Sequence, residues 1–291
     1  MMKAKRIIKK TAIGGLLFLI SHNVLSAVSD IKVKHIDVPA YNLISDTLVG
    51  MSAPVNGKRN DFVMQLICDL ARGDKTQPEV NAALEKNNVD ISSIPESNSI
   101  SSLLINGKKA EQASTCAAYI ATSLLVPVDN TALFDKKKNK DGTEDDVLNA
   151  MRFSEEMKVN MSVAQATANL YAVIASNIDR NSNQSFSDYQ ANIAETVYNY
   201  APEYLHLVQT LYTNDRATYT PLVLTKSTLV IEDNMNRELK VTSQGFVLKS
   251  RGVIWLGDGK ILGKDFFVPL NIIRSPVEKN NNKAQKTARN K

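Results

Sequence analysis

The longest regular pattern of apolar positions runs from residue 162 to residue 212. Apolar residues recur there at steps of three or four, the spacing of one helix face. Ser162 with Gln165, and Ser187 with Gln190, match the capping box that begins a helix. Pro202 is typical of a first helical turn rather than of a helix interior. We therefore expect three helices, which begin near residues 162, 187 and 202.

The first half of the chain has shorter helical patterns separated by polar turns. We expect helices over residues 60–72, 78–86 and 110–125, the first of which ends at Gly73, a residue favoured after a helix. The alternating stretch 31–38 indicates a short strand. Residues 135–146 are dense in charge and predict a surface loop. Thr143 then precedes a stretch with helical spacing that runs toward residue 158.

The pattern changes after residue 212 to short, β-branched stretches bounded by turns. We expect four or five antiparallel strands between about residues 222 and 270, with Trp255 in the core and Asp258-Gly259 as a hairpin turn. The fold class is therefore α+β, a mainly helical N-terminal body followed by a small antiparallel β-sheet module. We place the helical domain at residues 28–215 and the β module at residues 216–275.

The first residues have the three parts of a secretory signal peptide. Five basic residues precede the apolar stretch 12–20, and the small residues Ser26 and Ala27 follow it. Nine apolar residues are too few to span a membrane comfortably, so a retained anchor is the weaker interpretation. We expect cleavage after Ser26 or Ala27, no transmembrane span in the remaining chain, and a periplasmic or secreted protein of a bacterial envelope.

Removal of this segment changes the charge balance. The full chain carries a net charge of +5, and residues 1–27 contribute five basic and no acidic residues, so the mature chain is neutral. Residues 276–291 carry +4 and few apolar groups, which predicts a disordered basic tail. The body between is acidic, and we expect no binding of nucleic acid. The tail is either simply solvated or contacts anionic lipid or glycan.

Two cysteines, Cys68 and Cys116, lie in separate predicted helices. An even number of cysteines in an exported chain predicts a disulfide, and this one would join two helices. The alternative is a catalytic or redox thiol. It is disfavoured because the sequence has no Cys-x-x-Cys motif and no histidine near either cysteine.

One polar stretch resembles the loop of an EF-hand over 12 residues, 179–190. The residues at its ligand positions are Asp179, Asn181, Asn183 and Ser185. Gln184 replaces the glycine of the sharp turn, and Gln190 replaces the bidentate glutamate. One carboxylate remains, so the loop predicts at most weak calcium binding and no other cofactor. The alternative is a polar turn whose side chains cap two helices.

Few residues suggest catalysis. The sequence contains no His-x-x-x-His, Gly-x-Ser-x-Gly or Walker motif, and His206 lies in a helical stretch among leucines. A glycan hydrolase needs only two carboxylates, for which Glu195 and Glu203 are candidates. The sequence favours a non-catalytic envelope or secreted protein that binds another protein. A cell-wall glycan hydrolase and a secreted effector are the alternatives.

Overall fold

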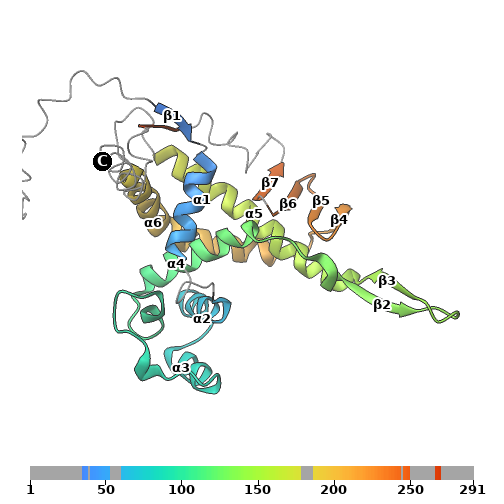
Figure 1. The fold of residues 1–291 in the computed structure, drawn as a ribbon, viewed down its shortest axis with the longest axis horizontal. Helices are drawn as coiled ribbons and strands as arrows, with labels where there is room; N and C mark the ends of the chain where they lie inside the picture. The colour runs from blue at the N-terminus through green and yellow to red at the C-terminus, as the bar shows by residue number, and fades with distance from the viewer. Residues whose placement is uncertain are drawn as a thin grey trace, which may run out of the picture.

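The chain has an α+β fold in a computed structural model that describes residues 35–38, 40–52, 60–177, 186–243, 245–249 and 266–269 (Figure 1). The helices are α1 Ala40–Met51, α2 Asp61–Arg72, α3 Gln77–Lys86, α4 Lys109–Thr122, α5 Ala150–Asn177 and α6 Phe186–Tyr212. The strands are β1 His35–Val38, β2 Phe134–Lys138, β3 Glu144–Leu148, β4 Tyr219–Leu224, β5 Thr228–Asp233, β6 Glu238–Thr242, β7 Gly245–Lys249 and β8 Phe266–Pro269. The predicted signal peptide, basic tail, Trp255 and Asp258-Gly259 turn lie outside the described residues.

The short helices α2, α3 and α4 confirm the predictions for these stretches. Asn60 caps α2, since its side chain accepts a hydrogen bond of 3.1 Å from the backbone of Val63. Gly73 ends α2 with φ +80°, a left-handed conformation that glycine adopts without strain. Thr76 and Glu79 form a capping box at the start of α3. Between α3 and α4 the chain forms two short 3₁₀ helices, Ile91–Ser93 and Ile100–Leu104.

The two long helices differ from the prediction. Ser162 was expected to begin a helix, but it lies inside α5, where its hydroxyl donates to the Val159 carbonyl at 2.9 Å. Such a bond lets serine occupy a helix interior. Pro202 was expected to begin a third helix, but it lies inside α6. Ala201 and Tyr204 on either side are fully buried, and we attribute the continuity of α6 across the proline to this packing.

Residues 40–51 form helix α1, which the sequence analysis missed. Leu43, Ile44 and Leu48 lie on one face of it and are buried in the main core. Ser45 on this helix is hydrogen-bonded to the hydroxyl of Tyr171 on α5 at 2.7 Å. The stretch is short, and Pro39, Gly50 and Pro54 interrupt the pattern within and around it.

The charged stretch after residue 133 is a β-hairpin rather than the predicted loop and helix start. Strands β2 and β3 pair antiparallel, with Lys136 opposite Asp146 and an ion pair of 2.6 Å between them. Gly142 sits in the turn with φ +86°. The side chains of both strands are mostly exposed, and Figure 1 shows the hairpin extending away from the helical body. Opposite charges across the strands stabilise such a pair, although alternating apolar residues are absent.

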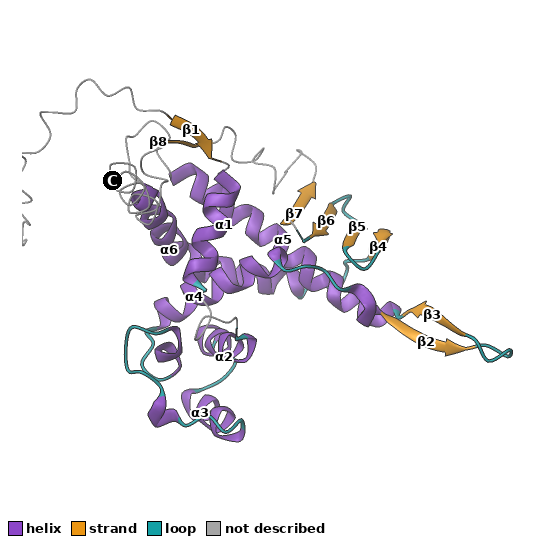
Figure 2. Cartoon of the chain, viewed as in Figure 1, coloured by secondary structure: helices purple, strands orange, loops and turns teal. Residues whose placement is uncertain are grey.

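The four strands β4 to β7 form an antiparallel sheet in sequential order, and β7 contacts α5 (Figure 2). The sequence predicted strands as far as about residue 270. Strand β8 lies in that range but pairs with β1 in a separate two-stranded sheet, Ile36 opposite Val268. Within the described residues, four of the expected four or five strands form one antiparallel sheet, and β8 is paired elsewhere. A strand pattern gives no information on which distant strand it will pair with.

The main core joins the helices to one face of the sheet. Its buried residues come from α1, α2, α4, α5 and α6 and from alternate positions of β5, β6 and β7: Leu229, Ile231, Leu239, Val241, Phe246 and Leu248. A second, smaller core lies between α2, α3 and the turn Ile100–Leu104. Among the described helices, none combines the length and apolarity needed to cross a membrane.

Candidate functional site

The candidate site is a cavity of about 690 Å³ where α2 ends, α4 begins and the second half of α6 passes both. We call it the α2–α4–α6 cavity. Its lining residues are Ala71, Arg72, Asp74, Lys109, Ala110, Ala113, Pro202, Leu205, His206 and Gln209. The volume lies within the range of small-molecule and side-chain binding pockets.

The floor of the cavity is apolar, and three of its four side chains are alanines. Ala113 and Leu205 are buried, and Ala71 and Ala110 are half-buried beside them. Alanines on two neighbouring helices leave open the space that larger side chains would fill. The floor therefore offers an apolar surface without an obstructing side chain.

The rim of the cavity is polar and exposed, and two of its groups are fixed by contacts. The Arg72 guanidinium donates to Asp74 at 2.6 Å and to the buried Asp69 at 3.1 Å. The Asp69 carboxylate also forms an ion pair with the Lys75 ammonium. The Lys109 ammonium donates to the Leu70 carbonyl at 2.5 Å, which holds this ammonium over the end of α2.

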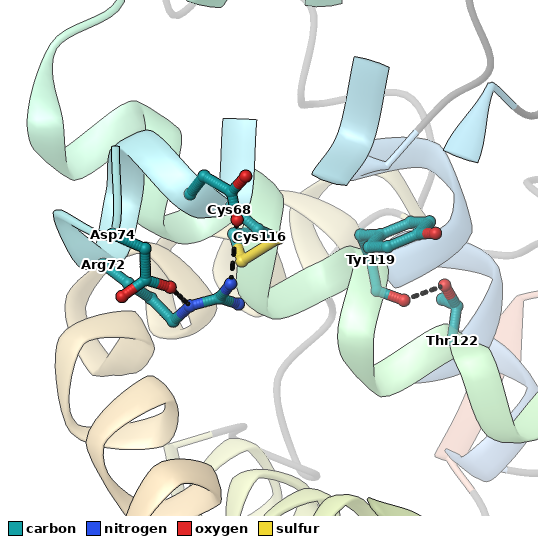
Figure 3. The surroundings of a disulfide bond; sticks show 7 residues. Cys68, Arg72, Asp74, Cys116, Tyr119 and Thr122 are labelled. Atoms are coloured by element: carbon teal, nitrogen blue, oxygen red, sulfur yellow. Dashed lines mark hydrogen bonds and ion pairs between the residues drawn. A yellow bond between two sulfur atoms is a disulfide. The ribbon is translucent and has the colours of Figure 1, made fainter. Parts of the chain in front are cut away.

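The disulfide between Cys68 and Cys116 joins two walls of the cavity. It connects α2 to α4, both sulfur-bearing residues are buried, and their Cα atoms are 4.9 Å apart. Cys68 lies one turn before Arg72, and Cys116 lies one turn after Ala113. Figure 3 shows Arg72 and Asp74 beside the disulfide. The predicted cross-link therefore positions the residues that line the cavity.

The predicted calcium ligands Asp179, Asn181, Asn183 and Ser185 lie outside the described residues, so calcium binding stays a prediction. In the part of the chain that is described, no group of three or more His, Cys, Asp or Glu side chains is placed to hold a metal ion. The side chain of His35 is likewise outside the description.

The two candidate carboxylates of a glycan hydrolase do not line the same hollow in the part of the chain that the structure describes. Glu195 lines a separate hollow of about 410 Å³ with Asn192 and Tyr200, and Glu203 is not in its lining. The two glutamates are eight residues apart on α6, which separates them by about 12 Å along the helix axis. Glycosidases hold their carboxyl groups about 5–9.5 Å apart, so this spacing disfavours the pair.

Among the residues that line the cavity, the sequence analysis weighed only His206 for a chemical role and interpreted it as a structural histidine. The structure places it at the exposed rim with Arg72, Asp74 and Lys109. These residues are separated by up to 134 positions in the chain and form no local motif. The available signals were indirect: the alanines near each helix end and the disulfide that brings α2 to α4.

Comparison with known proteins identifies no relative of this chain. No family model, no curated protein and no solved structure matches it.

Proposed function

We propose that this chain is a non-catalytic interaction or assembly component of a bacterial envelope, periplasmic or secreted. The observation that supports the proposal best is the α2–α4–α6 cavity, an apolar floor surrounded by an exposed polar rim. A partner protein would insert an apolar side chain into the cavity and contact the rim.

The cavity has the arrangement of apolar and polar groups that is typical of a protein interface. Interfaces place apolar anchors in central pockets and polar groups around them, and a few anchors dominate the affinity. The floor residue Leu205 is only 7% exposed, whereas Arg72, Lys109, His206 and Gln209 on the rim are exposed on three different helices. A partner that covers all three helices would remove this apolar floor from water.

The proposal also includes a periplasmic or secreted location. The disulfide between Cys68 and Cys116 supports an oxidising environment, as the predicted signal peptide does. A secreted effector remains an alternative, and fractionation distinguishes it, because an effector would accumulate in the culture supernatant rather than in the envelope.

Affinity purification of the tagged mature chain from envelope extracts tests the proposal. Ala110→Trp would fill the cavity from α4, and we expect it to reduce recovery of the partner at least tenfold, because the anchor would lose its pocket. Ala82→Trp is the matched control, since Ala82 is exposed on α3 and outside the cavity.

Two results would contradict the proposal. Equal recovery of the partner with Ala110→Trp and Ala82→Trp would show that the cavity does not bind it. Recovery of no partner, together with cell-wall digestion by the purified chain, would favour the glycan hydrolase instead. Circular dichroism of both variants checks that each is folded.

A further inference from the structure

We infer that the group that enters the α2–α4–α6 cavity is an apolar side chain accompanied by a carboxylate, on an acidic peptide segment of the partner protein. This inference rests on the proposed function and adds the chemistry of the partner. It follows from the charges on the rim.

The rim has one cation more than it has anions. Its charged residues are Arg72, Asp74 and Lys109, with His206 as an additional basic group. Asp74 forms an ion pair of 2.6 Å with Arg72. The buried Asp69 forms ion pairs with Arg72 and Lys75. Lys109 makes no ion pair with any residue in the described ranges. It is therefore the group that a partner's anion would meet.

The position of Lys109 suits this role. Its ammonium is held at the rim by the bond to the Leu70 carbonyl at 2.5 Å, which uses one of its three N–H donors. The other two donors are available to a carboxylate. Ala110, the next residue, lines the cavity, so an anion that reaches Lys109 brings its apolar neighbour to the floor.

A peptide fits the rim better than a small amphiphile does. The rim combines cations with Asp74 and Gln209, a mixture that a peptide meets with its own backbone and polar side chains. A fatty acid has one anionic group and would leave Gln209 without a hydrogen-bonding partner from the ligand. The exposed position of the rim on three helices also favours an extended contact.

Calorimetry with two dyes tests the charge preference. Anilinonaphthalene sulfonate and N-phenylnaphthylamine share an aromatic body, and only the first carries an anion. We expect the wild-type chain to bind the sulfonate about fivefold more tightly. Lys109→Gln should remove this preference and Lys86→Gln, an exposed lysine on α3, should retain it. Ala110→Trp should abolish binding of both dyes.

Equal affinity for the two dyes would overturn the inference, and so would unchanged sulfonate binding in Ala110→Trp or in Lys109→Gln. The envelope purification separates this failure from that of the proposed function. If Ala110→Trp loses the partner and Lys109→Gln retains it fully, the cavity binds a partner without needing a carboxylate, and only the charge inference fails.

Competition against the bound sulfonate dye identifies the source of the carboxylate. The competitors are a leucine-rich peptide containing glutamates, the same peptide with glutamine at each of those positions, and decanoate. We expect the acidic peptide to displace the dye at least fivefold more effectively than either of the others. Displacement by decanoate alone would assign the cavity to a free amphiphile and overturn the peptide assignment.

Discussion

At the scale of single residues, the contact between Thr167 and Tyr204 shows how α5 and α6 are held in register. The two hydroxyl groups are 3.0 Å apart, and both residues are fully buried. A buried hydroxyl without a partner destabilises a fold, so this pair satisfies two groups at once. Burial disfavours the charged phenolate and raises the pKa of Tyr204, although the bond to Thr167 opposes the shift.

The raised pKa of Tyr204 predicts a loss of stability in alkali. Below the ordinary tyrosine pKa of about 10, the folded and unfolded chains both keep the proton, and stability does not change. Above it, the unfolded chain loses the proton while the folded chain retains it, so the free energy of unfolding falls as pH rises. We expect urea denaturation between pH 8 and about 11 to show a smaller fall for Tyr204→Phe than for the wild type.

Tyr198→Phe serves as the control for this measurement, because Tyr198 lies on the same helix and is 41% exposed. It should retain the pH dependence of the wild type. Identical pH dependence of Tyr204→Phe and the wild type would show that the buried phenol does not contribute.

At the scale of elements, some helix ends could be predicted from local sequence signals, whereas other boundaries and pairings could not. Helix α2 was predictable because Asn60 and Gly73 mark its ends and its apolar face is regular. The continuity of α5 past Ser162 was not, since a serine before an apolar series has the same sequence whether it caps a helix or bonds to the preceding turn. The hairpin β2–β3 lacks apolar alternation, so only its cross-strand charges reveal it.

The disulfide joins α2 to α4 in the main core, and both helices also line the cavity. Replacing both Cys68 and Cys116 with alanine should lower the free energy of unfolding by about 4 kcal/mol, because the cross-link no longer restricts the unfolded chain. The same variant should bind the sulfonate dye more weakly, since α2 and α4 each supply part of the cavity. Urea denaturation and calorimetry measure the two effects.

The wild-type chain unfolded in the presence of a reductant is the control, because it loses the cross-link but retains both sulfur atoms. Its stability should match that of the double variant. An unchanged unfolding midpoint in the variant would show that packing alone holds α2 against α4.

At the scale of the whole molecule, the cavity was beyond sequence reasoning because its parts come from three helices. Arg72, Lys109 and His206 are ordinary surface residues when each is viewed in its own stretch of sequence. Their proximity depends on the packing of α4 against both α2 and α6. The α+β class, by contrast, is confirmed, because it depends only on local periodicity.

The pairing of β1 with β8 provides a prediction at this scale. A chain that ends at residue 265 lacks β8 and leaves the backbone of β1 without its antiparallel partner. We expect faster hydrogen exchange at the amides of residues 35–38 in that variant, with unchanged exchange in β5 and β6. Mass spectrometry of peptic peptides measures both regions. Retained protection of residues 35–38 would contradict this role of β8.

The same pairing sets the order in which the fold can be completed. Strand β1 precedes every other described helix and strand, whereas β8 follows it by about 230 positions. The partner of β1 is therefore synthesised after every other described helix and strand. The helical core and the four-stranded sheet can pack earlier, but β1 has no strand partner until the segment after β7 has been made, so this pairing closes the described fold late.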